Sequence, residues 1–179
     1  EGEVLQLSKV RDASTTEETY MEVIRGKTAM LFEASTHSAA ALAGSSEAQS
    51  EALRHFGDHL GIAFQLVDDL LDYQGDAATL GKNVGDDLAE GKPTLPLIYT
   101  MREGSAEQAA LVRTAIQKGG IEDLESIRAA VQASGSLDYT ANLAREHAEK
   151  AIACLEALTD NAYRDALIEL SRFAVARTH

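Results

Sequence analysis

Cysteine, tryptophan and proline are nearly absent from this chain: 179 residues contain one Cys, no Trp and two Pro. A single cysteine, Cys154, excludes a disulfide within the chain and fits a reducing compartment, so we expect a cytoplasmic protein. Cys154 lies among alanines and leucines, which favours a small buried side chain over a nucleophile. No apolar run approaches the length of a membrane span, so we do not expect an integral membrane protein.

Basic residues are also scarce. Lys and Arg number 16 against 29 Asp and Glu, which gives a formal net charge of −13. Nucleic-acid binding needs a basic surface, so this charge argues against a nucleic-acid partner. The same charge makes an anionic membrane surface an unfavourable place to dock.

The sequence has no alternating strand pattern and no internal repeat. Ala, Leu and Glu dominate, and they favour helix, so we predict an all-α protein. The periodicity indicates a loop over residues 75–92 and helices at about 15–43, 47–74, 93–103, 105–119, 121–133, 136–158 and 160–177.

Three of these helices begin with capping-box spacing, in which a Ser or Thr is followed three residues later by Glu or Gln. The predicted pairs are Thr15 with Glu18, Ser46 with Gln49, and Ser105 with Gln108.

The helix predicted for residues 47–74 carries carboxylates inside an apolar run. At 100° per residue, Gln65, Asp68, Asp69 and Asp72 fall within an arc of about 100° on one face. Three carboxylates on one face suit a hard divalent cation such as Mg²⁺, which takes further oxygens from water and phosphate. The alternative is an ordinary solvated acidic face.

Three lysines could bind phosphate oxygens, and two of them follow the acidic helix closely in the sequence. Lys82 and Lys92 lie in the following loop, and Lys27 and Thr28 lie in the middle of the predicted 15–43 helix. The loop is not a Walker A motif, because Asn83 follows Lys82 where Ser or Thr is needed. Solvated lysines and a back-bonded threonine are the alternative interpretation.

Two other pairs resemble metal ligands. We expect Asp86 and Asp87 to cap a helix or turn, with a second metal pair as the alternative. His55 and His59 have zinc-like spacing, but no third His or Cys lies near them in the sequence, so we expect a solvated polar face.

Three segments together resemble the C-terminal half of the trans-polyprenyl diphosphate synthases, and the opening residues 1–7 are similar too. The likeness extends over essentially the whole chain and is greatest to the long-chain bacterial type, octaprenyl diphosphate synthase. The segments are GKTA at 26–29, FQLVDDLLDY at 64–73 and GKNVGDDLAEGKPTLPL at 81–97.

This resemblance implies a long-helix bundle of the isoprenoid synthase type, of which residues 1–179 form the C-terminal part of one domain. Members have two aspartate-rich motifs, and only the second is present here. We therefore expect an incomplete bundle that lacks the N-terminal helices and the first motif, in a piece of a longer protein. Family dimers pair helices that correspond here to the start of the chain and to residues 15–43, so the longer protein is expected to be a homodimer.

The resemblance also implies a Mg²⁺-dependent prenyltransferase that adds isopentenyl diphosphate to an allylic diphosphate, and it assigns roles to residues. Asp68 and Asp69 would act in catalysis together with Lys27, and Thr28 and Gln65 would face the allylic cation. The full set is Asp68, Asp69 and Asp72 for the metal and Lys27, Thr28, Gln65, Lys82 and Lys92 for the substrate.

Two other functions stay open. Some members are non-catalytic subunits of hetero-oligomeric prenyl synthases, and terpene cyclases share the helical fold and the DDxxD chemistry. Because the family needs both aspartate-rich motifs, we expect this chain alone to be inactive.

Overall fold

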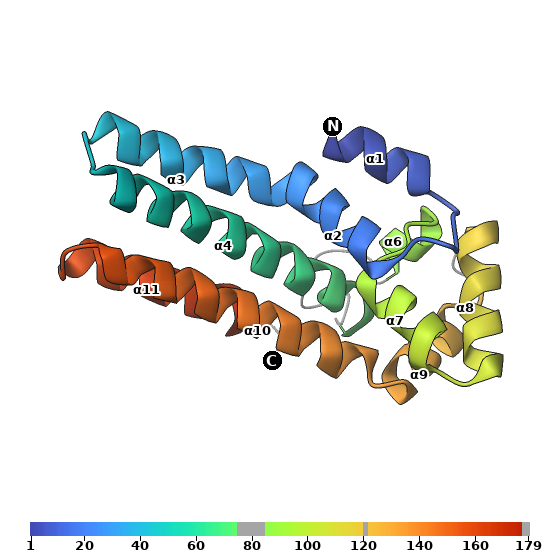
Figure 1. The fold of residues 1–179 in the computed structure, drawn as a ribbon. Helices are drawn as coiled ribbons and strands as arrows, with labels where there is room; N and C mark the ends of the chain where they lie inside the picture. Colours follow the sequence, from blue (N-terminus) through green and yellow to red (C-terminus); the bar gives the residue numbers. More distant parts are fainter. Residues whose placement is uncertain (75–84, 120–121, 177–179) are drawn as a thin grey trace.

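The structure, a computed structural model, describes residues 1–74, 85–119 and 122–176, and these residues form helices joined by short turns (Figure 1). The prediction of an all-α fold is confirmed. The elements are α1 (Gly2–Lys9), α2 (Glu17–Ile24), the π-helix η1 (Arg25–Ala29), α3 (Met30–Leu42), α4 (Glu47–Gln74), α6 (Asp86–Ala89), α7 (Leu95–Glu103), α8 (Ala106–Lys118), α9 (Leu124–Ala133), α10 (Ser136–Cys154), the 3₁₀ turn η2 (Leu155–Ala157) and α11 (Ala162–Ala176).

The 28-residue helix α4 is the axis of the molecule. Helices α3 and α10 run along it on either side, and α11 packs on α10 and α4 (Figure 1). The short helices α6 to α9 gather at the end of α4 where its acidic residues lie. No helix within the described ranges is both long and apolar enough to cross a membrane.

The predicted 15–43 helix is one helical stretch with a π-helix inside it. The predicted N-cap, Thr15, is wrong by one residue. Thr16 is the N-cap and accepts from the backbone N–H of Thr19, whereas the Thr15 hydroxyl donates to the carbonyl of Asp12. The π-helix covers Arg25–Ala29 and so contains Lys27 and Thr28. Such wide turns change the direction of side chains and are frequent at functional sites.

The remaining boundaries agree with the sequence to within a few residues. The two other capping boxes are confirmed by reciprocal hydrogen bonds, Ser46 with Gln49 and Ser105 with Gln108. The predicted 75–92 loop includes the single helical turn α6.

Two glycines permit close packing around the π-helix. A Cβ on Gly61 of α4 would lie 2.5 Å from the Cα of Ala29, and a Cβ on Gly2 of α1 would lie 2.3 Å from the backbone nitrogen of Lys27. Real Cβ atoms do not approach so closely, so glycine is required at both positions. These contacts press η1 between α1 and α4 and thereby fix the place of Lys27.

Candidate active site

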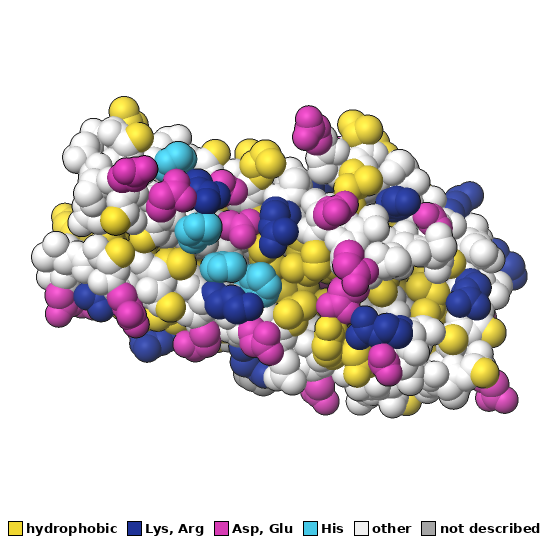
Figure 2. All heavy atoms as spheres, in the orientation of Figure 1, with side chains coloured by type: hydrophobic (Ala, Val, Ile, Leu, Met, Phe, Trp, Pro, Cys, Tyr) yellow, Lys and Arg dark blue, Asp and Glu magenta, His cyan; other side chains and the backbone are white. Residues whose placement is uncertain are grey.

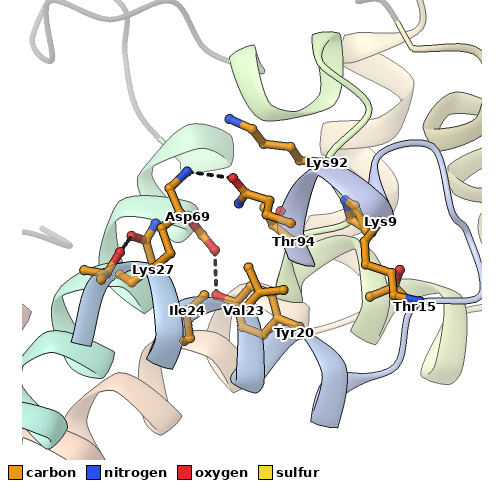
Figure 3. A pocket seen from close by; sticks show the side chains of 13 residues that line it. Lys9, Thr15, Tyr20, Val23, Ile24, Lys27, Asp69, Lys92 and Thr94 are labelled. Atoms are coloured by element: carbon orange, nitrogen blue, oxygen red, sulfur yellow. Dashed lines mark hydrogen bonds between the residues drawn. The ribbon is translucent and has the colours of Figure 1, made fainter. Parts of the chain in front are cut away.

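A small pocket lies where α1, α2 and η1 meet the C-terminal part of α4 and the turn before α7 (Figure 3). It offers about 30 Å³ to the centres of water-sized molecules, which is room for only one or two waters. Its polar lining comes from segments far apart in the sequence: Gln6, Lys9, Thr15, Tyr20, Lys27, Thr28, Gln65, Asp69, Lys92 and Thr94.

Four of these side chains form a continuous hydrogen-bonded chain between α2, η1 and α4. The Thr28 hydroxyl donates to Gln65 Oε1 at 2.7 Å, and Gln65 Nε2 donates to Asp69 Oδ1 at 2.7 Å. The Tyr20 hydroxyl donates to the other carboxylate oxygen, Asp69 Oδ2, at 2.5 Å (Figure 3). The structure therefore brings together three residues that the sequence singles out and adds Tyr20 to them.

Asp69 is only 4% exposed, and its pKa is raised to about 8, mainly by burial. The negative charges of Asp87 and Asp68 contribute to this increase, and the hydrogen bonds from Tyr20 and Gln65 oppose it. Negative charge is thus concentrated here, and a bound cation would relieve the repulsion.

Asp72 has a different environment. Its carboxylate accepts the backbone N–H groups of Gly85, Asp86 and Asp87, each at 3.2 Å, at the start of α6. Burial and the charge of Asp87 raise the pKa of Asp72 to about 6, against the lowering effect of these hydrogen bonds. The expectation that Asp86 and Asp87 would cap a turn is therefore wrong, because Asp72 is the residue that accepts from the turn.

Two of the predicted phosphate-binding lysines, Lys27 and Lys92, are paired with protein groups. Lys27 Nζ lies 2.6 Å from Gln6 Oε1 and 3.1 Å from a Glu3 carboxylate oxygen. Both partners are on α1, which the sequence did not connect with Lys27.

Lys92 Nζ lies 2.7 Å from a Glu90 carboxylate oxygen and 3.3 Å from Asp87 Oδ1. Burial works against the charge of Lys92, but these carboxylates outweigh it and raise its pKa. Lys82 lies outside the described residues.

The predicted metal ligands share α4, but they do not form a closed metal cage. In the part of the chain that the structure describes, no three His, Cys, Asp or Glu side chains are placed to hold a metal ion by themselves. Mg²⁺ commonly uses one or two carboxylates together with water and substrate phosphates. The hard oxygen donors of Asp68, Asp69 and Asp72 and their accumulated charge fit that mode of binding.

Sequence reasoning missed Tyr20 and expected Asp87 to cap a helix or turn. Tyr20 looks like a core residue, and its partner Asp69 is 49 positions away. The one available signal was its position seven residues before Lys27, which places both on a similar side of a helix.

The prediction of a solvated face for His55 and His59 is correct only for His55, which is exposed and lies 3.8 Å from a Glu51 oxygen. His59 Nδ1 instead lies 3.2 Å from Nδ1 of His147 on α10, and the His147 side chain is buried. Figure 2 shows histidines gathered on this face between charged side chains.

Comparison with known proteins gives a consistent result. A family model described as "Polyprenyl synthetase" matches residues 1–134. The chain is 52% identical over 180 aligned positions to the octaprenyl diphosphate synthase of Haemophilus influenzae, covering 100% of this chain and 55% of the relative. It is 53% identical to the octaprenyl diphosphate synthase of Escherichia coli (strain K12), covering 99% of this chain and 55% of the relative.

A solved structure matches this chain over a similar share of its own length. The polyprenyl synthase from Caulobacter crescentus CB15, crystallised with calcium and isoprenyl diphosphate, matches with a TM-score of 0.93 and 44% identity. That match covers 99% of this chain and 55% of the solved chain. The chain thus spans about half the length of the curated relatives it matches.

Proposed function

Because the chain belongs to the polyprenyl synthetase family, we propose that it carries the second aspartate-rich half of a trans-polyprenyl diphosphate synthase. The reaction is the head-to-tail addition of isopentenyl diphosphate to an allylic diphosphate such as farnesyl diphosphate. The product is a long all-trans polyprenyl diphosphate, most simply octaprenyl diphosphate, used for quinone side chains. The observation that carries this proposal is the hydrogen-bonded chain from Thr28 to Tyr20 through Asp69, beside Lys27 and Lys92.

Each residue has a part in handling an allylic diphosphate. Asp68, Asp69 and Asp72 would hold Mg²⁺, which would supply positive charge to neutralise the diphosphate and make it a better leaving group. Lys27 and Lys92 exchange their present carboxylate or amide partners for phosphate oxygens, and Lys82 joins them. The oxygens of Thr28 and Gln65 face the positive charge that develops on the allyl group and stabilise it.

The carbon–carbon bond then forms without a protein nucleophile. The double bond of isopentenyl diphosphate attacks the allylic carbon as the bond between that carbon and the diphosphate oxygen breaks. The new cation then loses a proton to the released diphosphate. The chain's contribution is to position charges before the reaction begins, which is commonly the largest part of enzymatic catalysis.

The second half of the site has to come from residues outside these 179. Apolar side chains lie exposed on α1 and α3, with Val4 70% exposed, Leu7 64%, Met30 53% and Leu31 72%. Exposed apolar surface of this kind supports docking of further helices and of a second protomer, so we propose a homodimer for the complete synthase. The free, half-buried Cys154 supports a reducing cytoplasmic setting.

A chimeric enzyme tests this proposal. The matching 55% of the E. coli octaprenyl diphosphate synthase is replaced by this chain, so that the relative supplies the first aspartate-rich motif. We expect the chimera to elongate farnesyl diphosphate with labelled isopentenyl diphosphate when Mg²⁺ is present, and to lose activity with EDTA. A cyclic hydrocarbon product would show a terpene cyclase instead, and a folded but inactive chimera would favour a non-catalytic subunit.

The isolated chain provides the complementary measurement. Half of a cavity cannot hold two diphosphates in reacting geometry, and a misplacement of about 1 Å can cost about a hundredfold in rate. We therefore expect no elongation by the 179-residue chain alone, but Mg²⁺-dependent binding of inorganic pyrophosphate in calorimetry. Robust elongation by the isolated chain would contradict the two-motif account.

A further inference from the structure

We propose that Tyr20 is a positioning residue for this reaction, and that its hydroxyl fixes the Asp69 carboxylate through the hydrogen bond between α2 and α4. This inference rests on the proposed function, because it assigns the bond a part in binding metal and diphosphate. It goes beyond that function by adding a residue from outside the aspartate-rich, lysine and glutamine positions.

The geometry makes the hydroxyl the functional part of Tyr20. The ring is 4% exposed and packs in an apolar cluster with Leu66, Val67 and Leu95, where a phenylalanine ring would fit equally well. The hydroxyl leaves that cluster and reaches Asp69 Oδ2 at 2.5 Å. Loss of the hydroxyl would therefore remove a donor and leave the apolar packing in place.

Asp69 depends on this donor because its surroundings leave few other partners. Its carboxylate is buried, and its other oxygen already accepts from Gln65 Nε2. A buried carboxylate without its hydrogen bonds loses much of what compensates its desolvation, so it would turn or shift toward other donors. A shift of Asp69 moves Gln65 and, through it, Thr28, because the hydrogen bonds link the three in series.

A structural role alone would have a different signature. A hydrogen bond that only stabilises the fold changes the free energy of unfolding and leaves the affinity of the folded protein for its ligand unchanged. A positioning role changes ligand affinity and turnover in protein that is still folded.

Tyr139 on α10 provides a matched control. Its hydroxyl donates to a carboxylate oxygen of Glu17 on α2 at 2.7 Å, so Tyr139, like Tyr20, is a tyrosine bonded to an acid on another helix. Tyr139 does not line the pocket. Tyr20→Phe and Tyr139→Phe therefore remove the same chemical group, one inside the site and one outside it.

The first experiment uses the 179-residue chain. Binding of inorganic pyrophosphate is measured by calorimetry across a Mg²⁺ series for the unsubstituted chain, Tyr20→Phe and Tyr139→Phe, and urea unfolding is measured in parallel. We expect Tyr20→Phe to weaken binding about tenfold or more and to raise the Mg²⁺ concentration needed for half-saturation. Tyr139→Phe is expected to bind as the unsubstituted chain does.

The second experiment repeats the two substitutions in the chimera. Tyr20→Phe is expected to lower kcat by about 10- to 100-fold at saturating substrate, with a smaller change in KM. Equal binding and equal kcat for Tyr20→Phe and Tyr139→Phe, in an active unsubstituted chimera, would overturn the role of Tyr20 alone. An unsubstituted chain that binds no pyrophosphate and an unsubstituted chimera that makes no product would overturn the proposed function and this inference together.

Discussion

The two ends of helix α4 are built for different purposes. Near its start, Phe56 and Leu60 pack into an apolar cluster with Ala151, Leu155 and Ala174 from α10, η2 and α11. Near its end, the same helix buries carboxylates among hydroxyl, amide and backbone donors. One helix therefore supplies a stabilising core at one end and a charged site at the other.

The difference shows how an unfavourable site is tolerated. The pKa of Asp69 is raised to about 8 and that of Asp72 to about 6, which means that their charged forms are disfavoured in the fold. Apolar burial contributes roughly 25 cal/mol for each Å² removed from water. The apolar cluster near the start of α4 contains no carboxylate and gains this stabilisation in full. Because α4 is continuous, the stability gained there also holds the acidic end in place.

The largest expected effect comes from the acidic end. Asp68→Ala in the chimera should lower kcat by about 10³-fold or more, because it removes a proposed ligand of the Mg²⁺ that would stabilise the leaving diphosphate. Product formation and helix content by circular dichroism are measured together. Glu149→Ala, an exposed acid on α10, is the control and should leave kcat near its starting value. Near-normal turnover in Asp68→Ala would remove this residue from the site.

The apolar end should respond in stability instead of activity. Phe56 is 1% exposed, and Phe56→Ala should lower the free energy of unfolding by ~3–5 kcal/mol, because it opens a cavity in the core. Phe173, which is 65% exposed, gives the matched control, and Phe173→Ala should change stability little. Urea unfolding of the chain measures both variants. Similar losses of stability would contradict the different burial of the two rings in the structure.

The pH dependence of stability distinguishes the His59–His147 pair from the acidic end of α4. The pKa of His147 is lowered to about 4, mainly by burial and next by the neighbouring His59. Between pH 6.5, which is about the pKa of histidine in the unfolded chain, and pH 4, the unfolded chain binds a proton at His147 and the folded chain does not. The free energy of unfolding therefore decreases as the pH falls from about 6.5 to 4. At about 1.36 kcal/mol for each pH unit the full loss would be ~3 kcal/mol, and solvent screening of the imidazole reduces the expected loss to ~2 kcal/mol.

A substitution isolates that contribution, because the raised pKa values of Asp69 and Asp72 act in the opposite direction over part of the range. His147→Gln should unfold with a shallower pH dependence than the unsubstituted chain in urea titrations between pH 7.5 and 4.5. His37→Gln, at an exposed position on α3, is the control. Identical pH profiles for all three proteins would show that His147 does not couple stability to pH.

The smallest effect concerns the cap at the start of α4. The backbone N–H of Gln49 donates to the Ser46 hydroxyl at 3.3 Å, and Ser46→Ala should lower the free energy of unfolding by ~1 kcal/mol. The loss should appear in urea unfolding and leave pyrophosphate binding unchanged, because the cap lies at the other end of α4 from the site. Ser45→Ala, one residue earlier, is the control, and a weakened affinity for pyrophosphate in Ser46→Ala would mean that the two ends are coupled.

Much of the fold could be predicted from the sequence because its signals are local. The 3.6-residue periodicity and the capping pairs Ser46–Gln49 and Ser105–Gln108 depend on residues a few positions apart. They give α4 and α8 nearly to the residue. The cap of α2 was wrong because Thr15 and Thr16 are adjacent and both can cap, and packing selects between them.

The sequence by itself determined the all-helical architecture, the shared face of Asp68, Asp69 and Asp72, and the family. Only the tertiary structure decided that Tyr20 meets Asp69, that Asp72 accepts from the start of α6, and that the Lys27 partners lie on α1. The physical reason is distance along the chain. Helix and cap formation depend on neighbours within about one turn. The pairing of a buried carboxylate is decided instead by whichever donors the packed helices carry to it, and here the Tyr20 donor lies 49 residues away.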